Sequence, residues 1–343
     1  MTRIKGEFFL APRVPALSQT PSTPGAGPVG SGPQLVAFAK PWLDWASQLR
    51  TLEARGLSVT DRAAAEAFLA HVNYYRLSGY CLAFEQTRHS FVAETTFEHV
   101  RESYEFDRVL RDLVTEALEV VEVDVRTAVA YHFGRQYGAF GHADASNFFR
   151  RAPTHRHAKP DEFNHSVWLS IIRQEARRSR ELFVDHFRTT YLGFPDLPVW
   201  IATEIMSFGA LSQMFKGMMR SDQRSIAHRY GVQPVFLTSW LHHLVYVRNV
   251  CAHHSRLWDR VWAIKPDLPP IASWAPPALP ANDRLFTTLL ILRQLLARSS
   301  GTAPFDIEWK ERVEHHLFCP PRAPRSLQRM GLTPEWRAHP HWA

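Results

Sequence analysis

The stretch Tyr246-Val-Arg-Asn-Val-Cys-Ala-His-His-Ser-Arg-Leu-Trp258 combines an apolar stripe with basic and amide side chains. Read as a helix, it places Asn249, His253 and Arg256 on one face, because these positions recur at i, i+4 and i+7. Arg248 lies one position round the helix, and its long side chain can reach that face. The stretch is therefore predicted to be a helix anchored in a core. Its apolar stripe consists of Leu244, Val247, Cys251 and Trp258.

Arg248, Asn249 and His253 suit the cleavage of an RNA phosphodiester without a metal ion. A histidine with a pKa near neutrality can take the 2′-hydroxyl proton or protonate the leaving 5′-oxygen. An arginine can stabilise charge on the phosphate, and an asparagine can orient the histidine or the phosphate. The spacing alone is a weak signal, because a helix end braced by Arg248 and Asn249 beside a surface histidine is the more common explanation.

The segment resembles the Arg-Asn-x-x-x-His motif of the HEPN superfamily. Its wider context, from Leu237 to Asp259, resembles the abortive-infection D/F (Abi) family within that superfamily. The resemblance extends from about residue 40 to the end of the chain. It is supported by Asn73-Tyr-Tyr-Arg-Leu-Ser-Gly-Tyr80, Pro198-Val-Trp-Ile-Ala-Thr-Glu204, Ser207-Phe-Gly-Ala-Leu-Ser212 and Met330-Gly-Leu-Thr-Pro-Glu-Trp-Arg337.

This resemblance implies an antiphage protein that acts as an RNA endonuclease, and we expect no cofactor. A cytoplasmic location is expected separately, because the sequence shows no signal core and no disulfide pattern. HEPN nucleases commonly build one active site from two motifs, and the single motif here implies a homodimer. The implied reaction is a transesterification that leaves a 2′,3′-cyclic phosphate and a 5′-hydroxyl. His253 would be the acid or base, Arg248 the phosphate clamp and Asn249 the orienting group, with His254 as second choice for the histidine role.

Two alternatives remain open. The protein could bind a small structured companion RNA and keep the motif silent until it is activated. It could also be the HEPN toxin of a toxin–antitoxin pair. A small structured RNA encoded beside the gene would favour the first alternative, and an adjacent antitoxin gene would favour the second.

Three further residues are candidates for supporting roles. Glu122 and Arg126 are spaced i, i+4 in a long predicted helix, which favours an ion pair within that helix. In HEPN folds the first long helix faces the motif helix, so both residues are also candidates for contact with the site. Arg76, among aromatic residues, could hold an RNA phosphate, although packing against a core with the arginine bridging an acidic partner is more common.

Arginines are concentrated in two other places. Arg150 and Arg151 belong to a polar stretch between residues 138 and 165, which is predicted to be an exposed loop. A helix predicted from Val167 to about Phe187 carries a row of arginines with few acidic neighbours. Both are candidate RNA contacts, since phosphates attract such clusters, but a solvated face is the alternative. The row consists of Arg173, Arg177, Arg178 and Arg180.

Composition sets broad limits on the function. The chain has 343 residues, of which 45% are hydrophobic, and a formal net charge of +7. This excess modestly favours a polyanionic partner. Three widely spaced cysteines form no metal or disulfide pattern, and the histidines lack partners at ligand spacing, so we expect no metal. No apolar run approaches the length of a membrane span.

The sequence predicts a mainly α-helical protein, an irregular bundle that contains a HEPN domain with extra helices at its C-terminus. Residues 1–36 are rich in Pro, Gly and Ser and are predicted to be a disordered arm. Residues 37–100 form an N-terminal helical segment, 101–262 the HEPN-like core, and 263–343 a Pro-rich connection with C-terminal helices. Within the core, one long helix is predicted from Tyr104 to about Phe133, ending before Gly134.

Overall fold

The computed structural model describes residues 37–149, 162–299 and 304–343. The chain divides into two compact units, Met1–Trp42 and Leu43–Ala343. In the first unit, residues 37–42 contain no helix or strand. The predicted arm of residues 1–36 lies outside the described residues, so every element below belongs to the second unit.

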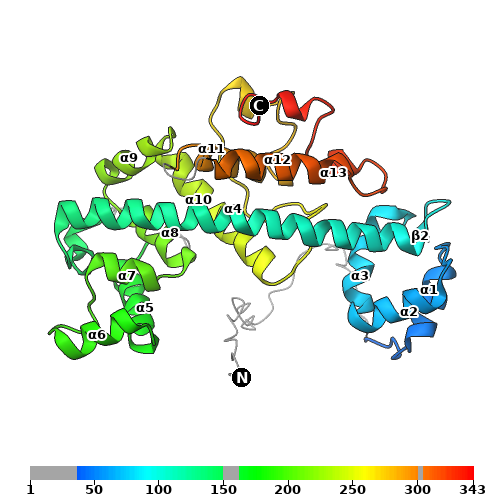
Figure 1. Ribbon diagram of the computed structural model, residues 1–343, viewed down its shortest axis with the longest axis horizontal. Coiled ribbons are helices and arrows are strands. Elements are labelled where there is room, and N and C mark those ends of the chain that lie inside the picture. Colours follow the sequence, from blue (N-terminus) through cyan, green and yellow to red (C-terminus); the bar gives the residue numbers. More distant parts are fainter. Residues whose placement is uncertain (1–36, 150–161, 300–303) are drawn as a thin grey trace, which may run out of the picture. The chain divides into compact units, whose positions relative to one another are not determined.

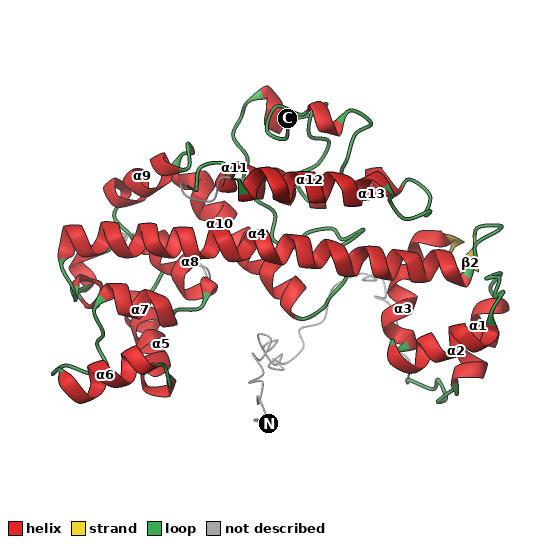
Figure 2. Ribbon diagram, viewed as in Figure 1, coloured by secondary structure: helices red, strands yellow, loops and turns green. Residues whose placement is uncertain are grey.

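The described part of the second unit is built almost entirely from helices (Figures 1 and 2). It contains 13 α-helices and is 63% helical, which confirms the predicted mainly α class. One small hairpin pairs β1 (Glu85–Thr87) with β2 (Ser90–Phe91). The helices are α1 (Trp45–Glu53), α2 (Arg62–His71), α3 (Tyr74–Cys81), α4 (Phe97–Tyr137), α5 (His165–Arg178), α6 (Leu182–Thr190), α7 (Val199–Ile205), α8 (Phe208–Gly217), α9 (Arg220–Arg229), α10 (Pro234–Ala252), α11 (Leu285–Leu296), α12 (Phe305–Phe318) and α13 (Ser326–Arg329). None of them is long and apolar enough to cross a membrane.

Helix α4 is the element on which most of the other helices pack (Figure 1). It has 41 residues and begins with a capping box, in which the Thr96 hydroxyl accepts from the His99 N–H and the His99 ring accepts from the Thr96 N–H. It contacts α3 and each helix from α7 to α12. The predicted N-terminal, central and C-terminal segments therefore share one core along this helix.

The predicted end of this helix near Phe133 is wrong, because α4 continues to Tyr137. Gly134 lies inside the helix, where a Cβ atom would come within 3.4 Å of Val199 and 3.5 Å of Trp200. The glycine therefore permits the close approach of α7, and does not terminate α4. The helix ends at Gly138, whose φ of 74° is a conformation that glycine adopts without strain.

The helix predicted from Val167 to Phe187 is also divided. Helix α5 ends at Arg178, and α6 begins at Leu182. Ser179 between them is extended, and its hydroxyl accepts from the Glu181 N–H at 3.2 Å. A serine side chain that satisfies a nearby backbone group competes with helix continuation, which accounts for the break.

Helix α10 is anchored through its buried side to the chain that follows it. Trp240 and His243 are fully buried on this side. The Trp240 indole N–H donates to the Asp267 carbonyl at 2.8 Å. The His243 ring donates from Nδ1 to the Ile264 carbonyl at 2.7 Å, and its Nε2 lies 2.9 Å from Thr288 Oγ1 on α11. These bonds attach the Pro-rich connection and α11 to α10.

Acid should weaken the fold through His243. Burial lowers the pKa of His243 to about 4, against 6.5 for an exposed histidine. Because the unfolded state binds the proton more tightly, this contribution to stability is complete above pH 6.5 and is lost as the pH falls toward 4. We expect the free energy of unfolding to fall by up to about 3 kcal/mol over this range. Urea unfolding at several pH values measures the effect.

The variant His243→Gln serves as the control, because it lacks the titrating ring. Its free energy of unfolding should depend less on pH between 6.5 and 4 than that of the wild type. Parallel pH profiles for the two proteins would show that His243 is not the titrating group.

Candidate functional site

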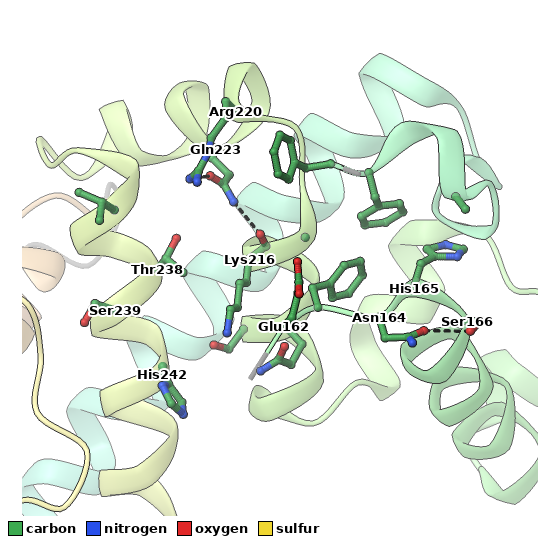
Figure 3. Close-up of a pocket in the computed structure, with 18 of the residues that line it drawn as sticks. Glu162, Asn164, His165, Ser166, Lys216, Arg220, Gln223, Thr238, Ser239 and His242 are labelled. Atoms are coloured by element: carbon green, nitrogen blue, oxygen red, sulfur yellow. Dashed lines mark hydrogen bonds between the residues drawn. The ribbon is translucent and has the colours of Figure 1, made fainter. Parts of the chain in front are cut away.

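Two features lie along α10, and the first is a pocket beside its N-terminal half (Figure 3). Its volume is about 900 Å³. Val235, Thr238, Ser239 and His242 of α10 form one wall. The opposite walls come from residues near the start of α5, from α8 and from α9, so the pocket has no continuous sequence signature and sequence analysis missed it.

The second feature is the predicted motif at the C-terminal end of α10. The helix ends at Ala252, so the prediction that it continues through Arg256 is wrong. His254 adopts a left-handed conformation with φ of 52°. The His254 N–H then donates to the Cys251 carbonyl at 2.9 Å, and the Ser255 N–H donates to the Val250 carbonyl at 2.9 Å. This pair of bonds is a Schellman motif, which closes the helix before His253.

The three predicted catalytic side chains all reach solvent. Arg248, Asn249 and His253 are exposed, whereas Val247 beside them is fully buried. Arg248 donates from Nη1 to Asn249 Oδ1 at 3.3 Å. Within the described residues, no side-chain hydrogen bond reaches the His253 ring. The backbone at the helix end is therefore ordered by its own bonds, while the imidazole stays accessible to a substrate.

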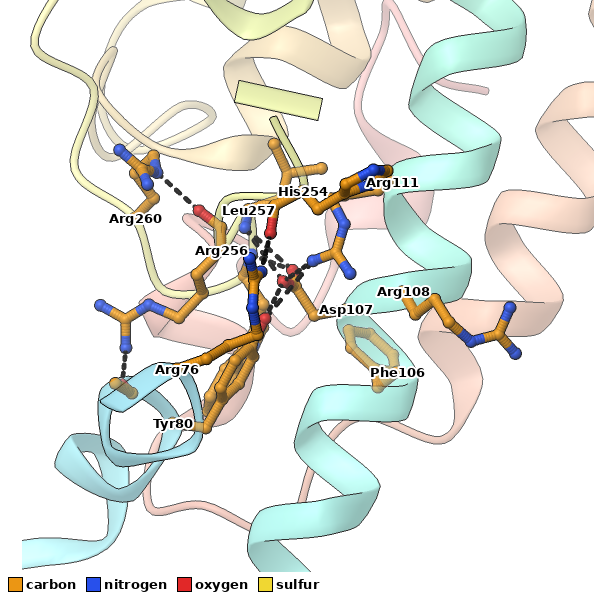
Figure 4. A network of polar contacts seen from close by, with 12 residues as sticks. Arg76, Tyr80, Phe106, Asp107, Arg108, Arg111, His254, Arg256, Leu257 and Arg260 are labelled. Atoms are coloured by element: carbon orange, nitrogen blue, oxygen red, sulfur yellow. Dashed lines mark hydrogen bonds and ion pairs between the residues drawn. The ribbon is translucent and has the colours of Figure 1, made fainter. Parts of the chain in front are cut away.

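A buried carboxylate holds the backbone behind these side chains (Figure 4). Asp107 of α4 is fully buried, and it accepts hydrogen bonds from Tyr80 Oη at 2.6 Å and from the Leu257 N–H at 3.0 Å. It also accepts from the Trp258 N–H and from Arg111 Nη1. Burial raises the pKa of Asp107, and the Arg111 guanidinium opposes that rise. Asp107 thus ties residues 253–258, here called the motif loop, to α4 and to α3.

Two arginines, one from α3 and one from the motif loop, each bind a backbone carbonyl of the other segment (Figure 4). Arg76 of α3 donates from Nη1 to the His254 carbonyl. Arg256 of the motif loop donates from Nη1 to the Gly79 carbonyl. The aromatic stretch around α3 is thereby joined to the motif, although the two are far apart in the sequence. Arg76, predicted to hold an RNA phosphate or to bridge an acidic partner, donates to this backbone carbonyl and is itself exposed.

Glu122 and Arg126 form the ion pair that their spacing allows, at 2.7 Å. Arg126 also donates to the Met206 carbonyl at 3.0 Å and to the Thr203 carbonyl, so it satisfies carbonyl groups at the end of α7. Cys251 lies beside Thr115 of α4, and Glu122 is two turns, or roughly 10 Å, further along that helix. Within the described residues, the bonds of this pair to other elements lead to the end of α7, and none leads to the motif residues. His254 takes part in the site through its carbonyl group.

The arginines of the predicted row differ in their surroundings. Arg173 binds Asp196 in a two-pronged contact, from Nε at 2.6 Å and from Nη2 at 2.9 Å. Arg177 and Arg178 are exposed at the end of α5, and Arg180 is exposed in the link to α6. Arg150 and Arg151 lie outside the described residues.

Comparison with known proteins identifies the family. Residues 67–259 match the model of the family described as Abi-like protein. The match covers more than half of the chain, so the protein belongs to the Abi-like protein family, and this membership indicates a role in abortive infection. No curated protein and no solved structure matches the chain. The matched range includes all of α3, all of α4 and the motif loop through Asp259, so it contains both sides of the Asp107 network.

Removing the buried carboxylate should destabilise the protein strongly. Asp107→Ala leaves Arg111 and two backbone N–H groups buried without their acceptor, and we expect a loss of about 3–5 kcal/mol in the free energy of unfolding. Asp112→Ala is the matched control on the same helix, because Asp112 is 72% exposed. It should change stability by less than about 0.5 kcal/mol. Equal effects of the two substitutions in urea unfolding would contradict the role given to Asp107.

Proposed function

We propose that this Abi-like protein is a metal-independent RNA endonuclease of abortive-infection defence against phage. The observation that carries the proposal is the exposure of Arg248, Asn249 and His253 together at an ordered helix end. An active site for a polymer needs accessible side chains on a rigid support. The Schellman closure and the Asp107 network supply that support.

The chemistry assigns one role to each group. The 2′-hydroxyl of the substrate attacks the adjacent phosphorus, and the bond from phosphorus to the 5′-oxygen breaks. His253 takes the 2′-hydroxyl proton or gives a proton to the leaving 5′-oxygen. Arg248 stabilises the negative charge that builds on the non-bridging oxygens, and Asn249 orients the phosphate or the imidazole. The products are a 2′,3′-cyclic phosphate and a 5′-hydroxyl.

One motif supplies one imidazole at this site, whereas the reaction needs both a base and an acid. We propose that a second copy of the chain brings its own Arg248 and His253, so that the active unit is a homodimer. His253 is exposed, and its ring has no hydrogen-bond partner among the described residues, which supports this arrangement.

The parts of the RNA strand away from the reacting phosphate would be held by basic side chains on another part of the protein surface. The exposed Arg177 and Arg180, at the end of α5 and in the following link, support such a role. Contacts of this kind to phosphates bind RNA without reading its sequence. Arg173 is a weaker candidate for such a contact, since its guanidinium already binds Asp196.

Substitution of His253 tests the chemistry. We expect His253→Ala to lower the rate of RNA cleavage by roughly 10² to 10⁴, because the proton transfer is lost. Arg248→Ala should lower it by roughly 10² to 10³ through loss of charge stabilisation. Both variants should unfold at the same urea concentration as the wild type, since both side chains are exposed. Cleavage is followed on a labelled single-stranded RNA.

Two controls separate this mechanism from others. A substrate with a 2′-deoxy sugar at the cut site should not be cleaved, because it lacks the nucleophile. EDTA should leave the rate unchanged, because no proposed step uses a metal ion. Normal cleavage of the deoxy substrate or full inhibition by EDTA would refute the 2′-hydroxyl mechanism, and unfolding of His253→Ala would give that residue a structural role instead.

A separate prediction follows from the proposed homodimer. The active protein should have twice the mass of one chain in light scattering at micromolar concentration, and its specific activity should fall on dilution as the dimer dissociates. The variant His253→Ala, mixed in excess with the wild type, should reduce activity by trapping wild-type chains in mixed dimers. Full activity in a protein that stays monomeric would rule out the shared site.

A further inference from the structure

We infer that the pocket beside the N-terminal half of α10 holds one nucleoside of the same single RNA strand that is cut at the C-terminal end of this helix. This inference rests on the proposed function, and it assigns a binding site to the strand at a fixed distance from the reacting phosphate. Its support comes from the geometry of α10, the aromatic walls of the pocket and the balance of charges around it.

The pocket and the motif lie on one face of α10. Positions 235, 238, 239 and 242 line the pocket, and the same helical periodicity continues through Tyr246 and Asn249 to His253. Asn249 follows His242 by two turns, or roughly 10 Å along the axis. Val245 and Tyr246 between them are only partly buried. Tyr246 packs against Trp262, and its hydroxyl accepts from Arg260 Nη1 at 3.4 Å, so a strand that runs from the pocket to the motif passes beside the segment that carries these two residues.

Aromatic rings give the pocket a surface on which a base can stack. Phe149 is 50% exposed, and its backbone N–H donates to the Gly217 carbonyl at 2.9 Å, which holds it at the pocket wall. The Arg220 guanidinium lies over its ring, 5.8 Å from the centroid. Phe163 supplies a second ring, backed by the buried Phe148 at 5.4 Å. Base stacking on exposed aromatic rings, with an arginine nearby, is a common way to hold single-stranded RNA.

The charges around the pocket favour a nucleoside over a group of phosphates. Among the described residues, the lining includes Lys216 and Arg220 but also Glu162 and Asp267, so the formal charges of this part of the lining balance. A site for several phosphates would need an excess of cations. His242 and Gln213 also line the pocket, and within the described residues no hydrogen bond reaches either side chain. They can bond to a base or a ribose.

This arrangement makes the length of the substrate important. A dinucleotide has only the two nucleosides joined by the reacting phosphate, whereas a longer strand has a further nucleoside for the pocket. A base in a duplex is stacked and paired, so it cannot enter without being extruded. We therefore expect the KM for single-stranded RNA to fall as the strand becomes long enough to reach the pocket, while kcat stays nearly constant because the groups at the cut are the same.

The test compares the wild type with two pocket variants on a ladder of single-stranded oligonucleotides from a dinucleotide upward. Thr238→Trp fills the pocket, and Phe149→Ala removes the stacking ring. Each should raise the KM for long strands by roughly 5- to 100-fold, as expected for one lost base stack, and leave the KM for the dinucleotide unchanged. Val123→Trp, at a 56% exposed position of α4, is the matched control and should behave as the wild type.

Binding of a fluorescent oligonucleotide, measured by anisotropy, separates this inference from the proposed function. If the wild type cuts no RNA, the proposed function fails, and the pocket is still supported if both variants weaken binding of the single strand. If the wild type cuts RNA but both variants bind and cut every length as it does, the pocket inference is overturned and the function stands. Equal binding of duplex and single strand by all three proteins also overturns it. Should Thr238→Trp fail to fold, Phe149→Ala decides the outcome.

Discussion

The carboxylate of Asp107 connects three segments that meet only in the folded protein. It accepts from Tyr80 of α3, from Arg111 of its own helix, and from two N–H groups of the motif loop. Removing a carboxylate from water costs several kcal/mol, and such a group is stable inside a protein only when donors surround it. Four donors do so here. The arrangement of α3, α4 and the motif loop therefore depends on this one group.

Two arginines add further hydrogen bonds between α3 and the motif loop. Arg76 and Arg256 each end on a backbone carbonyl of the other segment, so neither segment can shift without loss of two charge-assisted bonds. Arg76 binds the carbonyl of His254, the residue that follows His253 in the chain. The N-terminal helices are thus part of the support of the candidate site, although none of the three proposed catalytic residues comes from them.

Helix α10 divides its functions between two sides. Its buried side carries Trp240 and His243, which bond to the chain that follows the motif. Its open side carries the pocket wall and then Asn249. The buried side supplies the stability, since its side chains are fully removed from water, and the open side is left free to bind a ligand. A long, rigid helix can in this way keep two binding features at a constant separation.

Local sequence determined the helical class, the apolar stripes of α4, α10 and α11, and the residues of the motif, because periodicity and short motifs depend on neighbours along the chain. The ion pair of Glu122 with Arg126 follows from the same local rule. Tertiary structure alone decided that Gly134 would lie inside α4, that His254 would end α10, and that Arg173 would bind Asp196. It also decided the pocket and the position of Asp107, whose acceptor oxygens meet N–H groups 150 residues away in the chain. Sequence patterns do not encode such partners, since they form only when packing brings distant segments together.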